Sequence, residues 1–157
     1  MKIKTLYLKI TLLPVVAFII FFFSVLTIGL INIVRQGELS FIRGLFDLSL
    51  YISLGIALTI TLSVYKILVL IDKELSFTKD ALKYISRIKR LSILMTIVLL
   101  AAIPLFYRTS MDVGSTIVFI IGLAIIVTPA VIALFIATIE KLLYSIIQIK
   151  SENDLTV

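Results

Sequence analysis

The sequence contains no cysteine and no histidine. Without cysteine the chain has no disulfides, thiolate metal ligands or thiol nucleophiles. Without histidine it lacks the usual proton carrier near neutral pH and the imidazole metal ligand. The chain also shows no glycine-rich phosphate loop, no acidic pair within its apolar stretches and no serine with a base beside it. We therefore expect a protein that is not an enzyme, with no catalytic residue, no cofactor and no metal.

Apolar residues are abundant instead, at 61% of the sequence, against about 45–50% in an ordinary soluble domain. They gather in four long runs, and about 20 apolar residues suffice for a helix to cross a hydrocarbon core of about 30 Å. The sequence predicts one all-α domain over residues 1–157, an integral membrane four-helix bundle. Its predicted spans are residues 11–34, 48–71, 91–107 and 115–139. The first run is longer than the apolar part of a secretory signal, so we expect it to be a retained anchor.

Basic residues predict the orientation of these spans, because Lys and Arg near span ends are retained in the cytoplasm. Twelve of the 15 Lys and Arg residues precede the first run, surround the connection between the second and third runs, or follow the fourth. Only Arg35, Arg43 and Arg108 fall in the other two connections. We expect both termini and the middle connection to be cytoplasmic.

The middle connection has the pattern of a basic amphipathic helix over residues 76–90. At about 100° per residue its cations fall on one arc, and Phe77, Ala81, Tyr84, Ile85 and Ile88 fall on another. We expect this helix to lie in the headgroup layer and to lead into the third span. The cations either only fix the topology or contact anionic lipid or an acidic partner; without stacking aromatics on their face, we expect no direct nucleic-acid binding. The candidate contact residues are Lys79, Lys83, Arg87, Lys89 and Arg90.

The tail, residues 140–157, is expected to continue the fourth span as a helix. Its apolar side needs a partner surface, which is the inner leaflet, the basic helix or a second protomer of a homo-oligomer. That side carries Ile139, Leu142, Leu143, Ile146 and Ile147. A polar segment then closes the chain, and we take it as a candidate docking segment: Glu152, Asn153, Asp154, Leu155, Thr156 and Val157.

Two segments carry a family resemblance: residues 75–79 running on through 88–91, and residues 152–157, Glu-Asn-Asp-Leu-Thr-Val. Together they resemble the domain of unknown function 2975 family (DUF2975), small bacterial four-span membrane proteins. Ser76 stands where that family commonly has proline. The resemblance implies a protein of the bacterial cytoplasmic membrane, often encoded beside a small helix-turn-helix regulator, but it implies no biochemical mechanism.

A small and polar ridge runs along the second span, with four-residue spacing at first. Close helix packing accounts for such a ridge, since small residues let helices approach; a hydrated path is the alternative. The lysine of the ridge lies near the end of the span, where its ammonium can reach the interface. The ridge residues are Gly55, Thr59, Ser63 and Lys66.

Three functions remain open from the sequence. The first is a membrane regulator or sensor that binds a cytoplasmic partner, such as a small helix-turn-helix repressor, through the middle helix and the terminal segment. The second is an immunity protein against a bacteriocin or another membrane-active peptide. The third is an oligomeric channel or transport subunit, with Thr59, Ser63 and Lys66 lining the path.

Overall fold

The computed structural model describes residues 5–37 and 40–154, with the backbone alone for Asn153 and Asp154. Every regular element within these residues is helical, which confirms the predicted all-α class. In chain order the elements are α1 (Leu6–Gln36), α2 (Phe41–Asp72), α3 (Lys79–Leu99), the short 3₁₀ helix η1 (Leu100–Ala102), α4 (Ile103–Val113) and α5 (Thr116–Asp154).

Four segments are long and apolar enough to cross a membrane: α1, α2, the stretch from α3 through α4, and α5. Each contains one of the four predicted spans, so the existence of four apolar helices is confirmed. The helices extend beyond the apolar runs; α2, for example, begins at Phe41, with Ser40 as its N-cap. The connection between α1 and α2 is therefore shorter than the sequence indicated.

The third segment is interrupted inside its apolar run. η1 separates α3 from α4, and Pro104 lies in the first turn of α4. Proline has no N–H to donate, and its ring clashes with the carbonyl four residues earlier, here that of Leu100. The backbone tightens into a 3₁₀ turn at this point. α4 then ends at Gly114, whose φ of 68° is the left-handed conformation common after helices.

The amphipathic helix predicted at residues 76–90 forms the first half of α3, starting at Lys79. α3 runs as one helix to Leu99, so this half is collinear with the third span. Ala81 and Ile88, from the predicted apolar arc, are only 2% and 4% exposed. The arc is therefore covered by protein at Ala81 and Ile88, whereas Phe77 is 53% exposed, so the helix is packed on other helices rather than lying flat in the headgroup layer as we expected.

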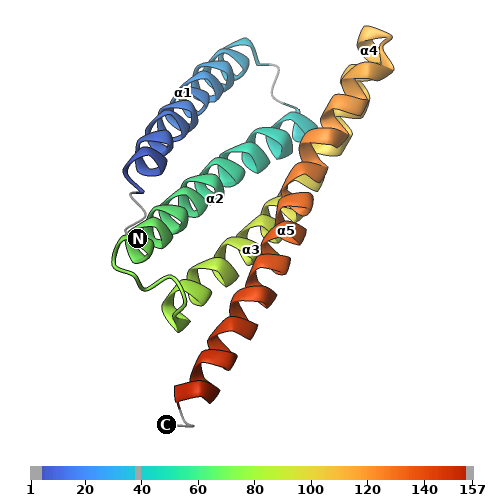
Figure 1. Ribbon diagram of the computed structural model, residues 1–157. Helices are drawn as coiled ribbons and strands as arrows, with labels where there is room; N and C mark the ends of the chain where they lie inside the picture. Colours follow the sequence, from blue (N-terminus) through green and yellow to red (C-terminus); the bar gives the residue numbers. More distant parts are fainter. Residues whose placement is uncertain (1–4, 38–39, 155–157) are drawn as a thin grey trace.

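The long helices pack side by side as an open row (Figure 1). α1 packs on α2, α2 on α3 and α3 on α5, while α4 packs on α5 and follows its first half. Within the described residues, α1 and α5 share no extensive contact. The expected four-helix bundle is thus not closed on itself, and α1 is held mainly by α2.

One end of the row is fixed by Asp72, the last residue of α2, just outside the predicted span. Its carboxylate accepts hydrogen bonds from the Thr5 hydroxyl (2.6 Å) and the Thr5 backbone N–H (3.3 Å), and it forms an ion pair with Lys9. The hydrogen bonds from Lys9 and Thr5 hold the pKa of Asp72 below its ordinary value. We call this end, with the start of α3 and the last turns of α5, the terminal end. The other end, with the α1–α2 connection and the α4–α5 turn, is the opposite end.

The side chains buried between the helices are mostly small, and large apolar side chains cover the outside. Thr61 and Ser63 are buried on α2, and each donates a hydrogen bond of 2.9 Å to a carbonyl of its own helix. This arrangement suits lipid surroundings, because apolar side chains gain little by leaving lipid whereas small residues let helices approach. The other buried hydroxyl residues among those described are Thr5, Ser49, Ser53, Ser92 and Ser110.

Candidate functional site

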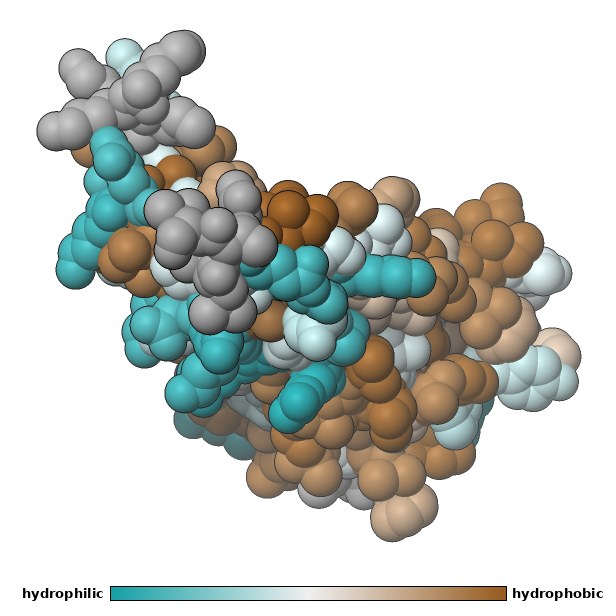
Figure 2. Space-filling view, turned by 60° about the horizontal axis from the view of Figure 1, so that its bottom comes forward, coloured by the Kyte–Doolittle hydropathy of each residue, from teal (hydrophilic) through white to brown (hydrophobic). Residues whose placement is uncertain are grey.

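Hydrophilic residues gather in a band at the terminal end, bordered by hydrophobic surface (Figure 2). The first half of α3 supplies the basic part of this end. The Thr78 hydroxyl caps the helix by accepting a hydrogen bond from the Ala81 N–H at 3.4 Å. Asp80 in the first turn adds a negative charge where the helix dipole favours one. This start fixes which face of α3 carries the cations.

Three of the predicted contact residues, Lys83, Arg87 and Arg90, come together on one exposed face of α3. With Ser86 and Leu91 they line an open hollow of about 490 Å³. None of the three forms an ion pair within the described part of the chain. Lys79 is exposed one turn earlier and does not line the hollow. The hollow therefore presents three cations that form no ion pair with any described residue.

Lys89, the remaining predicted contact residue, is instead used inside the protein. Its ammonium forms an ion pair with Glu140 of α5, and the Ser86 hydroxyl donates to the same carboxylate. Glu140 lies just past the predicted fourth span. The hydrogen bonds from Lys89 and then Ser86 lower the pKa of Glu140, and partial burial opposes them. These three residues join α3 to α5 at the terminal end.

The ridge on α2 does not form one continuous lining. Gly55 is exposed, and a Cβ there would meet nothing within 4 Å, so helices do not approach closely at this glycine. The Thr59 and Ser63 hydroxyls donate to carbonyls of their own helix, each at 2.9 Å. The Lys66 ammonium lies 5.5 Å from the centre of the Tyr84 ring, which supports a cation–π contact with α3. The ridge residues thus have separate local partners.

The terminal docking segment is only partly within the described residues. Glu152 accepts a hydrogen bond from the Gln148 side chain, one turn earlier, at 3.3 Å. The backbone of Asn153 and Asp154 continues α5. Leu155, Thr156 and Val157 lie outside the described residues. The tail is therefore helical as predicted, at least as far as Asp154.

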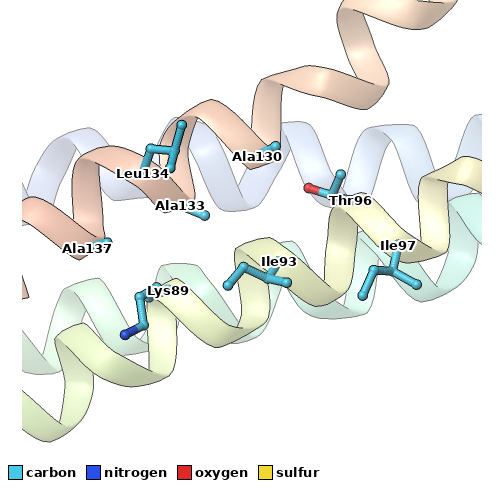
Figure 3. A pocket seen from close by; sticks show the side chains of 8 residues that line it. All are labelled: Lys89, Ile93, Thr96, Ile97, Ala130, Ala133, Leu134 and Ala137. Carbon is cyan, nitrogen blue, oxygen red and sulfur yellow. The ribbon is translucent and has the colours of Figure 1, made fainter.

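An apolar groove lies between α3 and α5, next to the Lys89–Glu140 pair (Figure 3). Its volume is about 350 Å³. Its α5 wall is made largely of alanines spaced three and four residues apart, which a search for small residues at helical spacing would have found; our sequence reading missed it. The lining residues are Lys89, Ile93, Thr96, Ile97, Ala130, Ala133, Leu134 and Ala137.

Within the described residues, no group of three or more Asp and Glu side chains is arranged to hold a metal ion. The terminal end presents exposed positive charge on α3 and, between α3 and α5, an apolar groove.

Comparisons with known proteins identify relatives of this chain. The family model described as "Protein of unknown function (DUF2975)" matches residues 38–157. The chain is 31% identical over 160 residues to the "Uncharacterized membrane protein YoaS" of Bacillus subtilis (strain 168), and the match covers 99% of each protein. The similarity to this relative thus includes α1, which lies outside the family match. No solved structure matches the chain.

Proposed function

The chain belongs to the DUF2975 family, and from this premise we propose that it is a non-enzymatic, multi-pass protein of the bacterial cell membrane that acts by binding a cytoplasmic partner at its terminal end. The partner we propose is an acidic surface on a small soluble protein, of which a helix-turn-helix repressor is the instance that the family resemblance suggests. Binding would hold such a regulator at the membrane.

The orientation in this proposal places the terminal end in the cytoplasm. It is supported by the distribution of Lys and Arg, twelve of which lie at or near this end of the four spans. The middle connection and the tail of α5 would then both face soluble proteins.

A single observation carries the proposal: Lys83, Arg87 and Arg90 surround an open hollow and have no ion-pair partner in the described residues. Lys9 and Lys89, by contrast, form ion pairs inside the protein. Arginine forms paired hydrogen bonds with carboxylates, so this face suits an acidic protein surface. Charge of this kind gives an interface its specificity and speeds association.

The test is in-cell crosslinking followed by purification of the full chain from its native host. We expect a soluble protein to be captured by the wild type and lost from K83E/R87E/R90E. A variant truncated after Lys150 tests whether the terminal segment also contributes. The matched control is K73E/K141E/K150E, which reverses three exposed cations of the same end outside the hollow and should still capture the partner.

Equal capture by both triple variants would show that the hollow is not the binding surface. If the wild type captures only itself or membrane components, the partner proposal fails and the activity belongs to the spans. The immunity and channel functions are then the ones to test. If cells that lack this protein are killed by a panel of membrane-active peptides no more readily than wild-type cells, the immunity function is rejected. If liposomes that contain the protein show no flux of ions or solutes, the channel function is rejected.

A further inference from the structure

A second polar hollow lies at the opposite end of the row, between the end of α1, the start of α2 and α4. Its volume is about 350 Å³. The charged residues of its lining are Arg43, Arg108 and Asp112, and Ser40 and Thr109 add hydroxyl groups. Ile33 and Leu105 complete the lining with apolar side chains. No sequence motif indicated this hollow, because its residues come from three separate helices.

Arg43 is anchored from behind by a buried carboxylate. Its Nε lies 3.8 Å from the Oδ2 of Asp47, one helical turn later, and the side chain of Asp47 is only 9% exposed. Neither of these two buried atoms has a hydrogen-bond partner within the described residues. The guanidinium also lies 6.0 Å from the Phe46 ring centre. Asp47 thus offsets the charge of Arg43 at ion-pair distance, without a hydrogen bond between these two atoms.

Arg108 is the cation without such an anchor. It is exposed on α4 and forms no ion pair within the described part of the chain, not even with Asp112 one turn later. The lining holds Arg43, Arg108 and Asp112, and since Asp47 offsets Arg43 from behind, Arg108 is the arginine of the hollow whose charge no ion pair within the described residues offsets. In the proposed orientation only three Lys or Arg residues lie outside the cytoplasm, and two of them line this hollow. That placement runs against the usual retention of cations in the cytoplasm.

We propose that this hollow binds a small anion carrying a carboxylate or phosphate group, with Arg108 as the principal donor and the outer edge of the Arg43 guanidinium as the second. Guanidinium groups form charge-assisted hydrogen bonds of fixed geometry with both kinds of anion. The Thr109 and Ser40 hydroxyls supply further donors. This site is independent of the proposed partner surface, which lies at the other end of the molecule.

The anionic group has two sources that share this chemistry: a free ion from the surrounding solution or the phosphate of a lipid headgroup. Ile33 and Leu105 bring the hollow to the border of the apolar surface, where a headgroup could enter. The experiment therefore has one arm for each source.

The first arm titrates the full chain, held in phosphatidylcholine nanodiscs, with inorganic phosphate and with acetate, and measures the heat. We expect saturable binding that R108Q weakens at least about tenfold, a loss near 1.4 kcal/mol. R35Q is the matched control, since Arg35 is an exposed arginine of the same end outside the hollow. D112N should strengthen binding a few-fold, because it removes the opposing charge.

The second arm uses nanodiscs containing phosphatidylglycerol and measures retained lipid by native mass spectrometry. A headgroup site predicts that wild type and R35Q retain this lipid and that R108Q does not. Dependence on Arg108 in either arm supports the proposal and identifies the source. If R108Q and R35Q behave alike in both arms, the proposal is wrong. The readout needs no cytoplasmic partner, so its failure is distinct from failure of the proposed function.

Discussion

At the residue scale, Glu140 links the two helices that pack most extensively, α3 and α5. The side chains of Lys89 and Glu140 are 30% and 21% exposed, so their pairing is only partly screened by solvent. We expect E140Q to lower the free energy of unfolding by about 1 kcal/mol, because the amide cannot form the ion pair. Chemical denaturation of the purified protein, followed by its helical circular dichroism, measures this. The control E74Q removes an exposed carboxylate that forms no ion pair in the described residues and should be neutral.

The same pair predicts how stability depends on pH. The pKa of Glu140 is lower in the folded protein than its ordinary value. Its contribution is therefore present above the ordinary carboxyl pKa and is lost as pH falls through the lowered pKa. We expect the difference between wild type and E140Q to shrink in acid. A difference that stays constant from neutral pH into that range would show that the ion pair contributes nothing.

Residue roles were predictable from sequence only where helical spacing decides them. The exposed arc of Lys83, Arg87 and Arg90 follows from a period of 3.6 residues. The role of Lys89 does not follow from helical spacing, since its partner is on another helix. Neither segment's sequence indicates that α3 packs against α5. Arg108 contributed to the sequence analysis only through its place in the chain, and the hollow that it lines requires three helices to meet.

At the element scale, Gly122 allows α4 to pack closely on α5. A Cβ at this position would lie 2.7 Å from both Cδ atoms of the Phe106 ring. That ring also packs edge-on against Phe46 of α2, with centroids 5.6 Å apart, so it has little room to move. We expect G122A to destabilise the protein by about 1–3 kcal/mol through overpacking.

The matched control is G55A, because a Cβ at Gly55 meets nothing within 4 Å. It should be neutral or stabilising by up to about 1 kcal/mol, since alanine favours helix over glycine. Denaturation curves of G122A and G55A measure the change in the free energy of unfolding that each substitution causes. An equal effect of both substitutions would mean that Phe106 yields and that the close approach at Gly122 is unimportant.

Among the elements, the four apolar helices were predictable because about 20 apolar residues in sequence have few other stable forms in lipid. The residues at which these helices begin and end were less predictable. α2 begins well before the predicted span, since Ser40 caps it and the charges of Arg43 and Asp47 pair along the helix. Close packing was expected along the ridge that begins at Gly55; a Cβ at Gly55 would meet nothing within 4 Å, whereas one at Gly122 would meet the Phe106 ring, because glycine spacing does not reveal which face meets a neighbour.

At the scale of the whole molecule, the orientation can be tested directly because the chain has no cysteine. We expect a single cysteine at Met111, exposed at the opposite end, to react with a membrane-impermeant maleimide on intact protoplasts. A cysteine at Ser151, exposed in the tail, should react only after lysis. The reverse pattern would place the terminal end outside and remove the basis for a cytoplasmic partner.

The order of the helices in the row was not predictable. Lipid tails are as apolar as the side chains that face them, so hydrophobicity does not select which helices become neighbours. Which helices become neighbours depends on a few polar contacts, such as that of Asp72 with Thr5, and on small residues, such as the alanines of α5. These features are interpretable only after the neighbours are known.

The length of α5 has a mechanical consequence. Its 39 residues extend about 58 Å, nearly twice the thickness of a hydrocarbon core of about 30 Å. α4 packs on the first half of α5, and the Lys89–Glu140 pair joins α5 to α3 closer to the tail, so a tilt of α5 about that pair would move its last turns. A tilt of about 10° there would displace the far end, some 14 residues or about 21 Å away, by about 4 Å. If the two proposals above hold, anion binding beside α4 would thereby change the position of the tail at the proposed partner surface.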